Sequence, residues 1–451
     1  MTTTISPEMR SWRIKIFTST WLTYFGFYFC RKAFYAVKGE LSTELGIDTT
    51  MLGYIGFVYL LSYTIGQFSA AWSGTKFGPR NLLLVGMLLS IVSNIAFGFA
   101  TNLWTIMTFM VLNGFAQATG WPSTIGVMAN WTTRKERGTI MGFWGTCFQF
   151  GGMCATWWAS LWLALQGWRG SFFAASVVLF LIWIYVYMVL QNNPKNVGLQ
   201  ELKEEDNTDE TQAQEETQNN ISNEEHEKTA PLFTKNVLTT VFLVGCFYFG
   251  VKFVRYALWS WTPYLLNTQF GLASDDAGYM STIFDLFGFM GAITAGVLSD
   301  KMFGGQRTGI SLIMLCGMIL GCGILFYAGT LAGTMEGDTP LHIFAFGLAV
   351  VGFMLFGPDA LLTGAGAMDL GSKRSALAAA GIINGMGSVG SMAQEIILPK
   401  VLESSKSGFV LWGISISERE STFAVLILAS IFAVLPLLIV VYRNKKGQSD
   451  L

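Results

Sequence analysis

The chain contains about twelve segments of about 20 mostly apolar residues, and this repetition strongly limits what it can fold into. The segments begin near residues 16, 51, 81, 103, 139, 169, 237, 278, 308, 341, 375 and 421. A helix needs about 20 apolar residues to cross the hydrocarbon layer of a membrane. Hydrophobic residues make up 52% of the chain and charged residues only 13%, which is more apolar than a soluble core requires. We therefore predict an all-α membrane protein with twelve transmembrane helices.

Charge and cysteine usage argue against several other kinds of protein. A net charge of -1 leaves no surplus of Lys and Arg for a phosphate backbone, so we expect no nucleic-acid partner. The six cysteines lie inside apolar segments without CxxC spacing or neighbouring histidines, which predicts neither a disulfide framework nor a zinc site. We expect no enzymatic chemistry, no metal and no cofactor, and we expect a monomer in the lipid bilayer.

A hydrophilic stretch divides the apolar segments into two groups of six. Residues 191–235 are crowded with Glu, Asp, Asn, Gln and Thr and contain few large apolar residues, which is typical of a flexible tether. We predict an N-terminal six-helix bundle over residues 1–190, a cytoplasmic linker over 191–235 and a C-terminal six-helix bundle over 236–451.

The short loops predict the orientation. With the N-terminus inside, Lys and Arg in the short loops and tails favour the cytoplasmic side by roughly three to one. This bias predicts both termini in the cytoplasm of a cell, with a bacterial inner membrane as the expected location.

The two halves share sequence patterns. Residues 24–31 read YFGFYFCR and residues 248–255 read YFGVKFVR, so both follow the pattern YFGxxFxR. Internal repeats of this size are typical of transporters built from related bundles. Because both halves begin on the same side, the repeat predicts two pseudo-symmetric bundles related by an axis along the membrane normal.

The repeat places Arg31 and Arg255 at equivalent positions inside two apolar helices. An ionised side chain there costs at least about 2.5 to 3.5 kcal/mol, so it requires a partner, a water-filled cavity or a ligand. Both arginines lie roughly 6 Å from the central plane. Two guanidinium groups that face one another repel unless an anion lies between them, and a phosphate can bind both forks. We predict a phosphate site; snorkelling or pairing with Asp285 or Asp359 is the alternative.

Further cations and tyrosines surround this pair. Lys252 lies one helical turn before Arg255, and Lys32 directly follows Arg31. Aromatic residues lie at helical spacing on both helices, and we expect the Tyr28 hydroxyl to bind a phosphate oxygen. The additional aromatic candidates are Tyr24 and Tyr256.

Two acids stand in apolar surroundings, where an ionised carboxylate is costly unless it is paired. We expect Asp285 or Asp359 to hold Lys252 or Arg255 when the site is empty, so that substrate competes with the acid. Lys38 stands near a helix end, where we expect its side chain to snorkel toward the membrane surface.

Over nearly its whole length the chain resembles the organophosphate:phosphate antiporters of the major facilitator superfamily. That family includes glycerol-3-phosphate and hexose-6-phosphate transporters and a related sugar-phosphate sensor. The resemblance rests on Arg255 and on the short motifs Arg31-Lys32-x-Phe34, Gly120-Trp121-Pro122, Arg134-Lys135-Glu136-Arg137-Gly138, Asn193-Pro194 through Gly198-Leu199, and Phe356-Gly357-Pro358.

The resemblance implies a rocker-switch fold in which the two arginines bind phosphate. It also implies that outward movement of inorganic phosphate drives inward movement of the organophosphate. Trp121 joins the candidate site on this basis. Phe148 and Gln149 stand where glycerol-phosphate members place a histidine, and Gln67 stands in place of a lysine. These departures disfavour glycerol 3-phosphate.

The stretch after Phe356 looks closer to hexose-phosphate carriers, so we expect a hexose phosphate such as glucose 6-phosphate. The alternatives are a membrane sugar-phosphate sensor that signals to a kinase, a glycerol-phosphate or phosphoglycerate transporter, and a transporter of an unrelated anion.

Overall fold

The computed structural model describes residues 6–133, 136, 140–141, 143–200, 235–302, 307–335, 337–362, 373–406, 409–411 and 414–446. The main helices of the first half are α1 (Pro7–Ala36), α3 (Thr49–Phe77), α4 (Pro79–Gly98), α5 (Leu103–Ala118), α6 (Gly120–Trp131) and α8 (Thr146–Val189). Those of the second half are α10 (Lys235–Phe270), α11 (Ser274–Met302), α12 (Arg307–Ala332), α13 (Thr339–Ala360), α15 (Lys373–Ser405) and α16 (Glu418–Lys445).

These helices provide the twelve predicted spans. Helix α8 contains two spans that are separated by non-helical backbone at Gln166 and Gly167, where the φ of Gly167 is 66°. Helices α5 and α6 form one span interrupted at Thr119. Within the described ranges, eight helices are long and apolar enough by composition alone to cross a membrane. The prediction of an all-α membrane protein is confirmed.

Local sequence signals fix several helix ends. The Ser6 side chain accepts a hydrogen bond from the Met9 amide, and proline follows at the first helical position of α1. Between α3 and α4, Gly78 adopts a φ of 79° that favours glycine, and Pro79 then begins the next helix. Such signals place short turns between long apolar helices.

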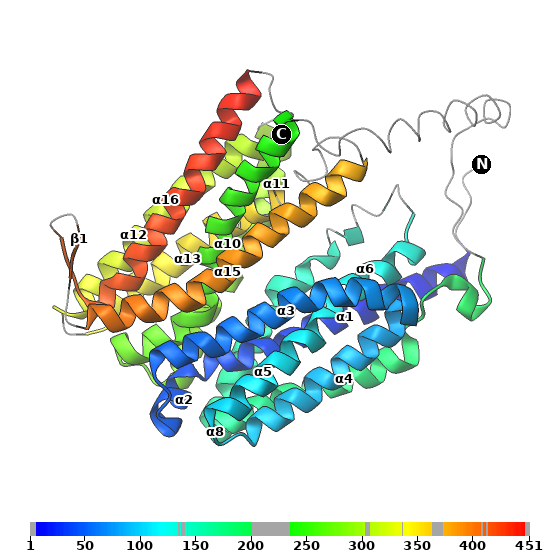
Figure 1. The fold of residues 1–451 in the computed structure, drawn as a ribbon, viewed down its shortest axis with the longest axis horizontal. Helices are drawn as coiled ribbons and strands as arrows, with labels where there is room; N and C mark the ends of the chain where they lie inside the picture. Colours follow the sequence, from blue (N-terminus) through cyan, green and yellow to red (C-terminus); the bar gives the residue numbers. More distant parts are fainter. Residues whose placement is uncertain are drawn as a thin grey trace.

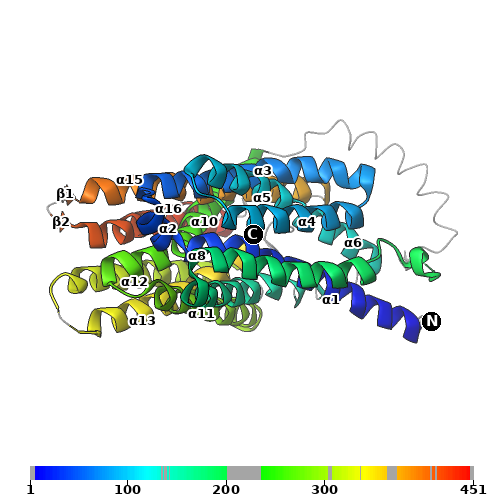
Figure 2. The same cartoon turned by 90° about the horizontal axis from the view of Figure 1, so that it is seen from below.

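Figure 1 shows two groups of helices, one containing α1 to α8 and the other α10 to α16. The start of α1 and the end of α16 both lie away from β1 (Figure 1), and the opposite end of the molecule carries a helix and a hairpin that the sequence did not predict (Figures 1 and 2). These are α2 (Lys38–Leu45) and an antiparallel pair of strands, β1 (Phe409–Leu411) and β2 (Ile414–Ile416). The short 3-10 helix η1 (Pro194–Val197) begins the predicted linker, whose residues 201–234 lie outside the described residues.

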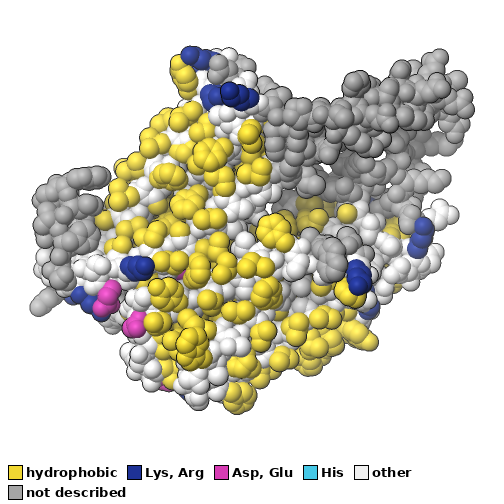
Figure 3. Space-filling model, viewed as in Figure 1, with side chains coloured by type: hydrophobic (Ala, Val, Ile, Leu, Met, Phe, Trp, Pro, Cys, Tyr) yellow, Lys and Arg dark blue, Asp and Glu magenta, His cyan; other side chains and the backbone are white. Residues whose placement is uncertain are grey.

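The surface is apolar where a bilayer would surround it. Hydrophobic side chains cover the middle of the visible face, and the charged side chains gather toward its ends (Figure 3). Phe68 and Leu320 are 77% and 70% exposed, whereas Asn113 and Gln117 are 3% and 1% exposed. This inverted distribution is expected of a chain solvated by lipid.

Contacts between the two halves lie on the side away from the start of α1 and the end of α16. Thr49 of α3 and Tyr264 of α10 share a hydrogen bond of 2.9 Å between their hydroxyl oxygens. Nearby, Gly53 approaches Glu395 so closely that a Cβ atom would clash with its backbone oxygen, and a Cβ atom at Gly278 would clash with the Ser160 hydroxyl. The Lys32–Asp285, Lys38–Ser260, Lys38–Glu395 and Thr49–Tyr264 contacts between the halves all lie on this side or near the middle. The halves are therefore closed against each other there.

Candidate functional site

Arg31 lies near the far end of α1 and is only 6% exposed. Its Nε donates to Oε1 of Gln117 on α5 at 3.1 Å, and the same oxygen accepts from the Tyr59 hydroxyl at 2.9 Å. The guanidinium carbon lies 5.0 Å and 4.8 Å from the ring centroids of Tyr28 and Tyr63. In the described part of the chain no carboxylate pairs with Arg31. Neutral hydrogen-bonding groups and aromatic rings therefore surround its positive charge.

Arg255 lies at the equivalent position of α10, but the protein balances it with an acid. Its Nη1 forms an ion pair with Asp359 of α13, one of the two acids anticipated for it. The guanidinium carbon lies 4.3 Å from the Trp259 ring centroid and 4.6 Å from that of Phe356. Within the described residues its Nε has no hydrogen-bond partner. The two equivalent arginines therefore occupy different electrostatic environments.

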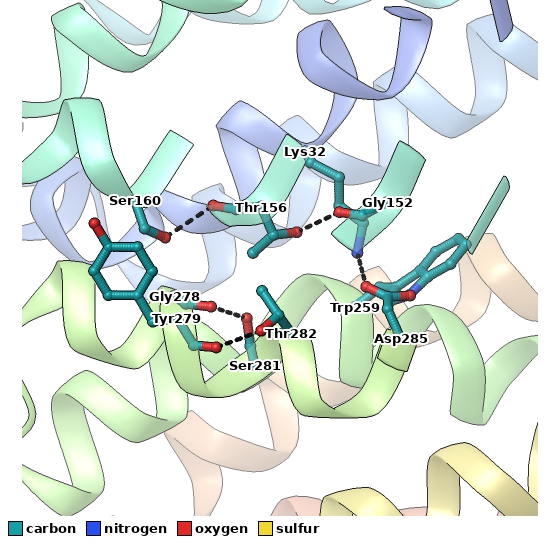
Figure 4. Close-up of polar contacts among 10 residues, drawn as sticks. All are labelled: Lys32, Gly152, Thr156, Ser160, Trp259, Gly278, Tyr279, Ser281, Thr282 and Asp285. Atoms are coloured by element: carbon teal, nitrogen blue, oxygen red, sulfur yellow. Dashed lines mark hydrogen bonds and ion pairs between the residues drawn. The ribbon is translucent and has the colours of Figure 1, made fainter. Parts of the chain in front are cut away.

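Of the two acids expected to hold Lys252 or Arg255, Asp359 pairs with Arg255, whereas Asp285 pairs with Lys32. Its Oδ2 lies 3.3 Å from Nζ of Lys32 on α1, and its Oδ1 accepts a 2.6 Å hydrogen bond from Nε1 of Trp259. Figure 4 shows Lys32 reaching Asp285 beside Gly152 of α8, where an added Cβ atom would lie in ordinary contact with both side chains, 3.5 Å from Oδ1 of Asp285. The pair joins the two halves because Asp285 on α11 faces α1 and α8.

Lys252 is bound by an amide instead of an acid. Its Nζ donates to Oδ1 of Asn384 on α15 at 2.9 Å and lies 4.8 Å from the centroid of the Tyr248 ring. Nζ of Lys32 and the guanidinium carbon of Arg255 each lie 4.3 Å from the Trp259 ring centroid, and Lys252 lies one turn before Arg255 on α10. All four cations therefore belong to one electrostatic group.

The aromatic candidates form two clusters. Tyr28 packs edge-on against Trp259 with 6.1 Å between ring centroids, and Tyr256 packs on the same indole at 5.3 Å. Because Arg31 contacts Tyr28 and Arg255 contacts Trp259, these rings connect the two cations.

The second cluster lies beside Arg31, toward the start of α1. The Tyr24 hydroxyl is 3.3 Å from that of Tyr63, and the Tyr24 ring packs against Phe148 at 5.1 Å and Trp121 at 5.8 Å. The Gln149 side chain has a buried Oε1 with no hydrogen-bond partner in the described residues.

Sequence reasoning missed the amides. Gln117 and Asn384 contact a cation directly, and Tyr59 and Tyr63 complete the surroundings of Arg31. An amide inside an apolar span is itself costly, so this signal was present in the sequence.

The snorkelling predicted for Lys38 was wrong. Its side chain is fully buried, with Nζ 3.2 Å from Glu395 and 2.6 Å from the Ser260 hydroxyl. Nζ also lies 3.6 Å from the Trp261 ring centroid. The ion pair joins α2 to α15 on the closed side. Lys38 does not reach the surface because the two halves pack against each other around it.

The fold and an independent sequence match decide the family. Residues 20–394 match the model of the Major Facilitator Superfamily. The chain belongs to the Major Facilitator Superfamily. Solved structures agree at the level of the fold. The chain superimposes with a TM-score of 0.73 on a bacterial homologue of the human lysosomal transporter Spinster. The two are 12% identical, and the match covers 98% of this chain and 99% of that one.

Curated relatives narrow the resemblance within the superfamily. A probable hexose phosphate transport protein of Chlamydia muridarum is 29% identical over 84% of this chain and 82% of its own length. The membrane sensor protein UhpC of Escherichia coli is 28% identical over 89% of this chain and 88% of its own length. The glycerol-3-phosphate transporter of Bacillus subtilis is 28% identical over 84% of each. The resemblance to organophosphate:phosphate antiporters is confirmed, and these relatives point to a multi-pass membrane transporter instead of an enzyme.

Proposed function

We propose that this major facilitator exchanges an organophosphate, a hexose phosphate such as glucose 6-phosphate, for inorganic phosphate by alternating access. The observation that carries the proposal is Arg31, a buried guanidinium whose terminal nitrogens have no acceptor among the described residues. Inside a membrane such a charge requires a partner, a water-filled cavity or a ligand, and the neutral partners of Arg31 leave its charge uncompensated. The planar fork of an arginine fits a phosphate with two parallel hydrogen bonds.

The charge of the site supports a phosphate dianion. Its four cations, Arg31, Lys32, Lys252 and Arg255, exceed its two acids, Asp285 and Asp359, by two charges. A phosphate monoester carries about -1.5 to -2 charges at neutral pH. Inorganic phosphate and an organophosphate therefore compensate the same excess, which suits one-for-one exchange.

Binding can change the contacts between the halves. A phosphate on Arg31 that also attracts Arg255 competes with Asp359, and one that attracts Lys32 competes with Asp285. Because Lys32 and Asp285 belong to different halves, weakening their pair loosens the closed side. We place both termini in the cytoplasm of a bacterial cell, and hence the closed side away from it, from the distribution of Lys and Arg. We propose that the monomer is the working unit.

The aromatic cluster supports a sugar over glycerol in the remainder of the substrate. Tyr24, Trp121 and Phe148 pack together beside Arg31. A sugar ring can stack on such faces, and a three-carbon chain offers less apolar area for that contact. Phosphoglycerates, with an additional carboxylate, suit this neutral surface less well.

A sensor that signals to a kinase is the second candidate, favoured by the 28% identity to the membrane sensor protein UhpC. Transport distinguishes the two functions. Proteoliposomes loaded with phosphate should take up labelled phosphate, and unlabelled glucose 6-phosphate should inhibit this uptake more strongly than glycerol 3-phosphate or phosphoglycerate. Binding of glucose 6-phosphate without exchange under any gradient would favour the sensor. Exchange inhibited equally by sulfate would favour a transporter of another anion.

Replacing Asp359 with Asn should raise phosphate affinity about tenfold, because the anion no longer competes with a carboxylate for Arg255. Calorimetric titration of the purified protein with phosphate measures this change. Asp276→Asn removes an exposed acid from the first turn of α11 and should leave affinity unchanged. Unchanged or weaker binding by Asp359→Asn would contradict competition between the acid and the ligand.

A further inference from the structure

A connected group of buried amides and hydroxyls lies behind Arg31. Asn113 and Gln117 stand one turn apart on α5, and Ser90 faces them from α4. The Ser90 hydroxyl donates to Oδ1 of Asn113 at 2.7 Å, and the Asn113 amide donates to the Cys30 carbonyl at 3.0 Å. None of the three side chains is more than 3% exposed. The network thus ties α4 and α5 to the backbone of α1 immediately before Arg31.

This network fixes which end of the Gln117 amide faces the arginine. Its Nε2 donates to Asn113 at 3.2 Å and is 3.4 Å from the Ser90 oxygen. Its Oε1 then receives two donors, the Arg31 Nε and the Tyr59 hydroxyl. A flipped amide would direct NH groups at the Arg31 Nε and would leave Asn113 Oδ1 without its glutamine donor, so only one orientation satisfies every group.

The Nε side of the Arg31 guanidinium is therefore hydrogen-bonded, whereas its terminal nitrogens are not bonded to any described residue. Gln117 binds the guanidinium through Nε, and the rings of Tyr28 and Tyr63 lie within 5.0 Å of its carbon. The terminal nitrogens have no acceptor in the described residues, and neither is a buried atom without a partner. Arg255 is arranged in the opposite way, since its terminal nitrogen is bound by Asp359 and its Nε is unpartnered in the described residues.

We propose that Gln117 is a positioning residue that holds Arg31 by Nε, so that both terminal nitrogens remain available to the phosphate. The role requires a neutral acceptor. A carboxylate at this position would neutralise Arg31 as Asp359 neutralises Arg255, whereas an amide orients the guanidinium and leaves its charge uncompensated. Arg31 is then the first cation to receive the anion, and Arg255 joins after Asp359 releases it. This inference rests on the proposed phosphate function.

Two substitutions separate orientation from charge. Gln117→Leu removes the acceptor and frees the guanidinium to rotate, so phosphate affinity should fall about tenfold, which corresponds to one charged hydrogen bond. Gln117→Glu keeps the size and the acceptor but adds a negative charge. Its melting temperature should equal or exceed that of the wild type, and its phosphate affinity should still fall at least about tenfold.

The matched control is Gln269→Leu. Gln269 lies on α10, is 9% exposed and donates to the Glu418 carbonyl far from the cations. The measurement is calorimetric titration of the full-length protein in lipid nanodiscs with inorganic phosphate, alongside thermal unfolding of each variant. Gln269→Leu should bind phosphate as the wild type does, even if its melting temperature falls.

The outcomes distinguish this inference from the function on which it rests. If the wild-type protein does not bind phosphate, the proposed function itself is wrong. A wild type that binds, together with unchanged affinity in folded Gln117→Leu and Gln117→Glu, overturns the positioning role alone. If Gln117→Leu fails to fold, Gln117→Glu decides, because wild-type affinity in that variant contradicts the need for a neutral acceptor.

Discussion

Replacing Arg31 or Arg255 with Lys should lower phosphate exchange about 100-fold, although each variant keeps its positive charge. A lysine ammonium is a single point of charge and cannot offer the planar fork that binds two phosphate oxygens at once. Each charged hydrogen bond that is lost costs roughly 1.5 to 3 kcal/mol, and 1.4 kcal/mol is a factor of ten. At Arg31 the change also removes the Nε that binds Gln117.

Exchange of labelled phosphate in proteoliposomes measures this effect, with the amount of folded protein determined for each variant. Arg169→Lys is the control because Arg169 is 43% exposed and lies 3.7 Å from Glu44 at the protein surface, away from the four cations. Its exchange should match the wild type. Full exchange by both Arg31→Lys and Arg255→Lys would contradict a phosphate clamp.

Replacing Glu395 with Gln should destabilise the closed side by roughly 3 to 5 kcal/mol, which is the cost of leaving a buried ion without its partner. Both Lys38 and Glu395 are fully buried, so in this variant the lysine has only neutral groups around it, namely the new amide, the Ser260 hydroxyl and aromatic rings such as Trp261. Opening this side would hydrate Lys38. The variant should therefore favour conformations in which the halves separate here.

Distances between spin labels on α2 and the first turn of α11 measure this opening, and thermal unfolding reports the loss of stability. Glu403→Gln is a matched control on the same helix, since Glu403 pairs with Lys406 at 2.8 Å and both are about half exposed. Such a surface pair contributes about 0 to 1 kcal/mol.

Replacing both charges, with Lys38→Met and Glu395→Leu, should restore closure because no unpaired charge then remains. Equal distances and melting temperatures in Glu395→Gln and Glu403→Gln would show that the pair does not hold the closed side.

The sequence alone was sufficient for the membrane architecture and for the two arginines. Apolar segments of spanning length predict helices because the bilayer leaves backbone groups no other partner, and this constraint acts within each segment. The repeated YFGxxFxR pattern marked Arg31 and Arg255 because an arginine in such a segment is expensive. Glycine and proline at Gly78 and Pro79 likewise indicated a turn through local backbone geometry.

Only the tertiary structure decided which groups these cations meet. Arg31 and Gln117 are 86 residues apart, Lys32 and Asp285 are 253 apart, and Lys38 and Glu395 are 357 apart. Whether two such side chains meet depends on the rotation and depth at which their helices pack, and the apolar pattern of a membrane span constrains both only weakly. The sequence by itself determined that cations stand inside the membrane. The packing of helices decided that Arg255 faces an acid, Arg31 a neutral amide and Lys38 a buried partner in the other half.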